Sequence, residues 1–265
     1  MDHGHESKLR AEEAHEIEKH VALYQIDDPE SLRMKPRDWE KFATAEPLCA
    51  YRASVLALGD IQDVEVLDAG CGDGWLSVIL AKLGARVTAF DVSPEGVEVA
   101  KLRARVNGVA DRIDFHCASF YEMPFADDRF NLVIGQAILH HLRDKDAASI
   151  ELSRVMAPGA RALFVECLGR SQILERIRLF VPVASGAPED PDHWKEQISD
   201  DDLERLGSHF EMQVHEYQLF SRLTRIFRGP RFMDWINRVD VRVLDAAPFL
   251  RRYARTALIE LRKAS

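Results

Sequence analysis

The stretch Val64–Gly74, VEVLDAGCGDG, decides the fold of this chain. Its apolar first half is typical of a buried strand that ends near Asp68, and its glycine-rich second half is typical of a tight turn into a helix. Glycines at 70, 72 and 74 let the backbone turn sharply and approach a ligand closely. Taken alone, the stretch also fits a strand-to-helix turn that binds nothing.

Strand-like and helix-like segments alternate on both sides of this turn. Apolar runs predict strands at residues 64–68, 86–90, 112–116, 131–135 and 160–165. Helical spacing predicts helices at residues 6–23, 37–58, 75–83, 94–107, 137–142 and 147–156. Such alternation forms right-handed βαβ units around a parallel sheet. The sequence therefore predicts an α/β fold with helices on both faces of the sheet.

The regular alternation weakens after residue 168. We expect a loop at 186–191, a helix that begins after Ser199, a strand at 210–217, basic helices within 222–247 and a final strand at 256–262.

The composition is that of a globular protein. The 265 residues are 46% apolar and 30% charged, which suggests one or two domains. No apolar run approaches the roughly 20 residues that span a bilayer, and the polar first twenty residues predict a cytoplasmic protein without a targeting peptide. The 4 cysteines lack CxxC spacing, and the N-terminal histidines lack i, i+4 spacing, so we expect no disulfide and no metal site.

Charge is distributed unevenly along the chain. The net charge is −9, yet residues 221–265 hold eleven basic and four acidic side chains, so the remainder carries −16. An acidic body argues against binding to nucleic acid, whose phosphates dominate such affinity. The basic segment 222–247 therefore requires its own explanation.

A second acidic residue narrows the choice of ligand. Asp91 ends the next predicted strand, 17 residues after Gly74, where a carboxylate can bind both hydroxyls of a ribose. A dinucleotide site would normally show GxGxxG, whereas here Asp68 precedes a GxGxG pattern. This arrangement favours a ligand with a ribose and a cationic amino-acid part over one with a pyrophosphate.

LDAGCGDG at 67–74 and VTAFDVS at 87–93 resemble motif I and the acidic loop of class I S-adenosylmethionine-dependent methyltransferases. The segment ASFYEMPFADDRFNLVIGQAILHHL at 118–142 is similar to their small-molecule branch, the type 11 or ubiquinone/menaquinone-biosynthesis-like group. The resemblance covers about residues 60–166. It implies a Rossmann-like, seven-stranded sheet of order 3-2-1-4-5-7-6 with strand 7 antiparallel. It also implies an N-terminal helical cap at 1–59 and a methyltransferase domain at 60–265 with a helical insertion at 221–250.

The resemblance also implies the residues that hold S-adenosyl-L-methionine. Asp91 would bind the ribose hydroxyls, and Ser119 stands where the family usually has an aspartate that binds the adenine amino group, which is a departure. The remaining implied cofactor residues are Asp68, Gly70, Cys71 and Gly72 at the methionine part, Val92 and Phe120 at the adenine, and Gln136 near the sulfonium.

The candidate catalytic residues follow the fourth and fifth strands. The resemblance places the substrate near His140 and His141, and it places Glu166 beside them, where its carboxylate could orient a histidine base. A base is needed only if the acceptor is an alcohol or phenol; otherwise proximity and alignment supply most of the rate.

The leading hypothesis is a methyltransferase that acts on a small molecule at an oxygen nucleophile and releases S-adenosylhomocysteine. The sequence Gly135–Ile138, GQAI, lacks the Asn/Asp-Pro-Pro-aromatic motif of base amino methylation and the Pro-Cys of cytosine methylation. A cofactor-binding regulatory module without turnover and a methyltransferase for a lipid-like acceptor remain alternatives. Residues 222–247 would then be either a lid over the substrate pocket or a peripheral contact with an anionic membrane.

Overall fold

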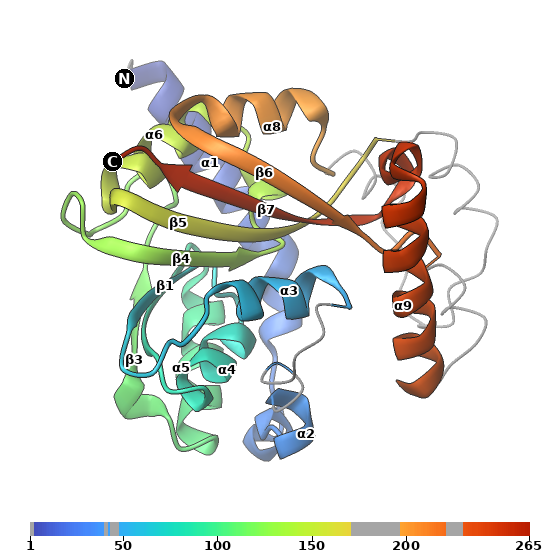
Figure 1. Ribbon diagram of the computed structural model, residues 1–265. Helices are drawn as coiled ribbons and strands as arrows, with labels where there is room; N and C mark the ends of the chain where they lie inside the picture. Colours follow the sequence, from blue (N-terminus) through green and yellow to red (C-terminus); the bar gives the residue numbers. More distant parts are fainter. Residues whose placement is uncertain (1–2, 40–41, 43–47, 171–196, 221–229) are drawn as a thin grey trace.

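The computed structural model describes residues 3–39, 42, 48–170, 197–220 and 230–265, and a seven-stranded sheet forms its centre (Figure 1). The strand order is β3-β2-β1-β4-β5-β7-β6. β7 runs antiparallel to both of its neighbours, and the other pairs are parallel. The strands are β1 Glu65–Ala69, β2 Arg86–Asp91, β3 Ile113–Cys117, β4 Phe130–Gln136, β5 Met156–Cys167, β6 Phe210–Tyr217 and β7 Thr256–Lys263. The predicted Rossmann-like fold and strand order are confirmed.

Helices cover both faces of the sheet, as Figure 1 shows. One face carries α3 Ala50–Ala57, α4 Trp75–Lys82 and α5 Pro94–Val106. The other carries α6 Lys145–Val155 and α8 Asp200–Leu206. The remaining helices are α1 His3–His20, α2 Pro36–Trp39 and α9 Pro230–Ala246, with short 3₁₀ turns η1 Val21–Tyr24, η2 Pro29–Leu32, η4 Ala110–Arg112, η5 Leu139–His141, η7 Gly207–His209 and η9 Pro248–Tyr253.

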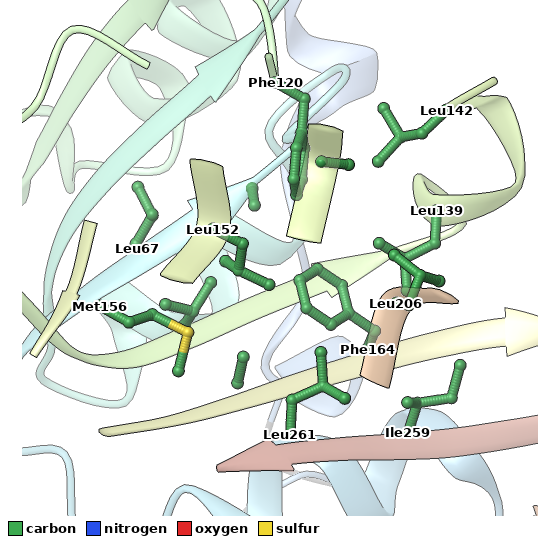
Figure 2. Close-up of a cluster of buried hydrophobic side chains, with 14 of the residues drawn as sticks. Leu67, Phe120, Leu139, Leu142, Leu152, Met156, Phe164, Leu206, Ile259 and Leu261 are labelled. Carbon is green, nitrogen blue, oxygen red and sulfur yellow. The ribbon is translucent and has the colours of Figure 1, made fainter. Parts of the chain in front are cut away.

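Apolar side chains fill the space between the sheet and each helical layer. Leu67 of β1 and Phe164 of β5 lie in the cluster beneath α6 and α8, which Figure 2 shows in close-up. Val66, the neighbour of Leu67, belongs to the cluster on the opposite face because successive strand residues point to opposite faces. Burial of one such side chain contributes about 1.5–3 kcal/mol, so the central strands are held firmly from both sides.

Local signals set several helix boundaries as the sequence predicted. The Ser199 hydroxyl accepts from the Asp202 backbone N–H, and the Asp202 side chain accepts from the Ser199 N–H, which forms a complete capping box. Ser93 caps α5 in a similar way, with Pro94 at the first helical position. Gly59, with φ of +79°, follows the end of α3.

Two predicted helices differ from the structure. Within residues 137–142 only the short turn η5 forms, because Ala137 adopts a left-handed backbone with φ of +54° and turns the chain sharply after β4. The described part of 37–58 contains α2 and α3 instead of one helix, and Cys49 before α3 is extended at φ −152° and ψ 162°.

The strand predicted at 160–165 begins earlier, at Met156, so that Pro158 and Gly159 lie inside β5. Gly159 has φ of +77°, and the pairing of β4 with β5 is irregular between Phe130 and Leu132. The strand therefore accommodates the two residues as a local irregularity and continues.

The helix α9 confirms the described part of the predicted basic helical segment. Ile236 and Leu244 are buried on one side, whereas Trp235 and Arg242 are exposed. The predicted loop at 186–191 and the beginning of the basic segment, 222–229, lie outside the described residues.

Candidate active site

The carboxyl ends of β1, β2 and β4 bring together the polar residues that the sequence singled out. Asp68 lies near the end of β1, Asp91 ends β2 and Gln136 ends β4, and these strands are neighbours in the parallel part of the sheet. In open α/β sheets ligands bind at this edge, where the strand order reverses. The reversal here lies between β1 and β4.

The glycine-rich turn after β1 depends on glycine at position 70. Gly70 has φ of +73°, and a Cβ atom there would lie only 2.5 Å from Cγ1 of Ile138, in the turn that follows β4. A side chain at this position would thus collide with the neighbouring loop. Gly72, with φ of +52°, has Tyr24 as its near neighbour and keeps the backbone open toward the ligand side.

Asp91 is held in place by backbone N–H groups on both sides of the site. Its Oδ2 accepts a hydrogen bond of 2.8 Å from Gly72 N, and its Oδ1 accepts one of 2.9 Å from Ser93 N. The carboxylate therefore joins the turn after β1 to the start of α5. This preorganisation suits an acceptor for ribose hydroxyls.

Asp68 is a buried acid whose ionised form is disfavoured. Its side chain is 1% exposed, and Ser77 Oγ donates a hydrogen bond of 2.5 Å to Oδ2. Burial, opposed by the Ser77 hydrogen bond and assisted by the nearby charge of Asp91, raises the pKa of Asp68 to about 7. A cation placed against this carboxyl would restore the ionised form, so the residue is suited to an ammonium group.

Two adjoining cavities lie at this edge of the sheet, with volumes of about 460 and 300 Å³. Gly70, Asp91 and Val92 border both of them. Of the sequence-predicted cofactor residues, the larger cavity is also lined by Asp68, Cys71, Gly72 and Gln136, and the smaller one by Phe120. Ser119 borders neither of the two cavities and instead lies beside a separate hollow.

The donors and acceptors of the larger cavity fit the methionine end of S-adenosylmethionine. Nε2 of Gln136 is buried, and nothing in the described residues accepts a hydrogen bond from it. An amide donor without a partner and the Asp68 carboxyl face one space, as a ligand with both a carboxylate and an ammonium requires. The residues present therefore fit the implied cofactor.

The two predicted histidines are joined to carboxylates from different parts of the chain. Nδ1 of His140 lies 2.7 Å from Oε2 of Glu166 at the end of β5, and Oε1 of Glu166 accepts from the backbone N–H groups of Ile138 and Leu139. Glu166 is 1% exposed and so fixes both the turn η5 and the ring of His140. Nδ1 of His141 lies 3.1 Å from Oε2 of Glu16 in α1.

The two imidazole rings have centroids 4.0 Å apart and are tilted by 40°, but they face different surroundings. His141 borders both cavities, whereas His140 borders neither of the two, although its side chain is 10% exposed. Buried Lys145 donates to the carbonyl oxygens of Leu139 and Leu142 and so closes the same turn from α6. Burial lowers the pKa of Lys145.

The helix α1 supplies site residues that the sequence analysis did not identify. Glu13 and Glu16 lie one turn apart on α1 and both border the smaller cavity, and Glu13 accepts a hydrogen bond from the Ser119 hydroxyl. Their i, i+3 spacing on a predicted helix was visible. Nothing in the sequence indicated that this helix packs against the loop after β3, more than 100 residues away.

Comparisons with known proteins find similarity to methyltransferases. Residues 67–164 match the family model described as a methyltransferase domain. The methyltransferase GfsG of Streptomyces halstedii is 36% identical over 110 residues, which cover 41% of this chain and 40% of that protein. The ubiquinone biosynthesis O-methyltransferase of Xanthomonas oryzae pv. oryzae is 29% identical over 187 residues, 68% of this chain and 77% of that protein. The chain thus spans less than half of GfsG.

Solved structures confirm the fold. The [4+2]-cyclase SpnF matches with a TM-score of 0.57 and 22% identity, and the match covers 80% of each chain. That protein is described as a cyclase, so likeness of fold leaves the reaction open.

Proposed function

We propose, on the premise that this chain carries a class I S-adenosylmethionine-dependent methyltransferase domain, that it transfers a methyl group to an oxygen nucleophile of a small molecule. S-adenosylhomocysteine would be the second product. The observation that carries the proposal is the His140–Glu166 pair at the carboxyl edge of the sheet, where the next residue, His141, borders both cavities. The O-methyltransferase named among the relatives supports the same kind of acceptor.

Each of the two cavities would hold a different part of the cofactor. Asp68 and Gln136 would hold the ammonium and carboxylate of its methionine part in the larger cavity, and Asp91 would bind its ribose at the junction. The apolar smaller cavity, with Val92 and Phe120, would take its adenine. When bound, S-adenosylmethionine supplies a methyl group on a positively charged sulfur.

His140 is the proposed general base. The Glu166 carboxylate holds the proton of His140 on Nδ1, which leaves Nε2 as the basic nitrogen. Nε2 would take the proton from the acceptor hydroxyl as its oxygen attacks the methyl carbon. The acceptor must approach the methyl group from outside the cofactor cavities. The general base that takes the acceptor's proton therefore need not border these cavities. Glu166 is a positioning residue that acts through the imidazole.

Production of S-adenosylhomocysteine over a panel of phenols, alcohols and amines tests this function. Turnover confined to hydroxyl compounds, with a loss of about 10²–10⁴-fold in His140→Ala, is the expected result. Glu166→Gln should lower turnover and shift its pH profile while cofactor affinity stays within about twofold. Tight binding of S-adenosylmethionine without turnover of any acceptor would favour the regulatory module.

A second proposal concerns the basic segment 222–247. On α9, which makes up most of its described part, Trp235 is 56% exposed and Arg242 is exposed. Phe249, 72% exposed, and exposed Arg252 follow the segment in η9. Exposed aromatic and basic side chains on an amphipathic helix are typical of contact with an anionic membrane surface. This arrangement would suit a lipid-like acceptor. None of the helices within the described ranges is long and apolar enough to cross a bilayer.

Vesicle co-sedimentation distinguishes the membrane contact from a lid over the substrate pocket. Membrane contact predicts binding to anionic but not to neutral vesicles, reduced by high salt and by Trp235→Ala. A lid predicts no binding to either kind of vesicle, together with loss of turnover when residues 222–247 are removed.

A further inference from the structure

The smaller cavity is bordered by a carboxylate that the function described above does not use. Its walls include the apolar side chains of Leu9, Phe90 and Phe120, and Glu13 of α1 lies among them. Glu13 is half-buried, and burial raises the pKa of its carboxyl. A carboxylate in apolar surroundings is costly unless hydrogen-bond donors reach it.

One of those donors belongs to the protein. The Ser119 hydroxyl, in the loop after β3, donates to Oε1 of Glu13, and the same hydroxyl accepts a hydrogen bond of 3.0 Å from Tyr121 N. Ser119 is thereby turned toward Glu13 and away from the cavity. Among the described residues, Ser119 is the donor found for Glu13, at Oε1, and Arg10 is a nearby positive charge.

The charges around the smaller cavity also favour a ligand that donates hydrogen bonds. Its lining includes four carboxylates, on Glu12, Glu13, Glu16 and Asp91, against two basic side chains, on Lys8 and Arg143. Asp91, at the junction with the larger cavity, is already engaged by backbone N–H groups. Glu16 lies 3.1 Å from Nδ1 of His141. Glu13, whose carboxylate Ser119 holds in place, is therefore the acceptor suited to an N–H group on the part of the ligand that enters this apolar space.

We infer that Glu13 accepts a hydrogen bond from the exocyclic amine of the cofactor's 6-aminopurine, so that a side chain of α1 contributes to the selection of the base. The inference rests on the proposed function, which places the adenine in this cavity. Ser119, predicted from the sequence to contact that amine, acts instead as the residue that orients Glu13. Selection of the base thus depends on an N-terminal helix that precedes the whole sheet.

The test compares S-adenosylhomocysteine with S-inosylhomocysteine, its analogue with a 6-oxo group, by calorimetric titration. The wild type should bind the amino compound about ten- to a hundredfold more tightly, the scale of one hydrogen bond to a charged group. Glu13→Gln should abolish or reverse this preference, because the introduced amide can donate to the 6-oxo group. Ser119→Ala should reduce the preference by releasing the Glu13 side chain.

Glu12→Gln is the matched control, since Glu12 borders the same cavity and the substitution removes the same charge. It should leave the preference for the amino compound intact. If Glu13 has a purely structural role, Glu13→Gln should bind both compounds more weakly, with an unchanged ratio of the two affinities. That result would overturn this inference and leave the proposed function standing. Failure of the wild type to bind S-adenosylhomocysteine would overturn the proposed function as well. Unchanged thermal unfolding curves would show that each variant is folded.

Discussion

Asp68→Asn tests whether the buried carboxyl group near the end of β1 binds the cationic group of a ligand. Its pKa of about 7 in the ligand-free site lies about three units above the ordinary value of roughly 3.9. That difference corresponds to at most about 4 kcal/mol by which burial disfavours the ionised form. An ammonium group beside the carboxyl would offset this cost and lower the pKa of Asp68, so ligand binding should be linked to proton release.

The expected size of the linkage follows from the pKa. At about pH 6 roughly 90% of Asp68 is protonated in the free protein, so binding should release about 0.9 proton and be about tenfold weaker than at about pH 8. Calorimetric titration of S-adenosylhomocysteine in two buffers of different ionisation enthalpy measures that proton count directly. The wild type should release this proton on binding at about pH 6 and release almost none at about pH 8.

Asp68→Asn separates this effect from any contribution of the other ionisable side chains that line the same cavity. The variant keeps an acceptor for the Ser77 hydroxyl but should bind the ligand more weakly and without the proton release. Equal proton release in the variant, or ligand binding as tight as in the wild type, would refute the reasoning.

The raised pKa of Asp68 also predicts the direction in which the stability of the folded protein changes with pH. Because the folded-state pKa of Asp68 is raised, the unfolded chain loses this proton first as the pH rises from about 4 to about 7. The wild type should therefore lose stability over that window. The stability of Asp68→Asn relative to the wild type should rise over the same window, by at most about 4 kcal/mol, as urea unfolding at several pH values would measure.

Four further substitutions test the rest of the site. Asp91→Ala should weaken binding of S-adenosylhomocysteine by about 1.5–3 kcal/mol, and calorimetry of the folded variant that gives wild-type affinity would disprove a ribose contact. Gly70→Ala should lower the free energy of unfolding by about 2–4 kcal/mol, because its Cβ meets Ile138 and its φ is positive; thermal unfolding checks this. His140→Ala should lose turnover with cofactor affinity intact, whereas His141→Ala should lose cofactor affinity because it borders both cavities. The opposite pattern in the two assays would reverse their roles.

The sequence by itself determined the sheet and the position of the ligand edge. The strand at 64–68 and the acids at 68 and 91 were readable because apolar runs, glycine turns and strand-terminal carboxylates are local features of neighbouring residues. The cap before α8 was readable for the same reason, since Ser199 and Asp202 are only three residues apart.

Only the tertiary structure decided which side chains meet at that edge. Glu166 fixes His140 across 26 residues because β4 and β5 are adjacent. Ala137, the first residue of the helix predicted at 137–142, prevents that helix because the turn after β4 needs a left-handed residue there. Glu13 meets Ser119 across 106 residues, a contact set by how α1 packs and not by any local pattern. Hydrophobic periodicity specifies which face of an element is buried, whereas its partner depends on the packing of the whole chain.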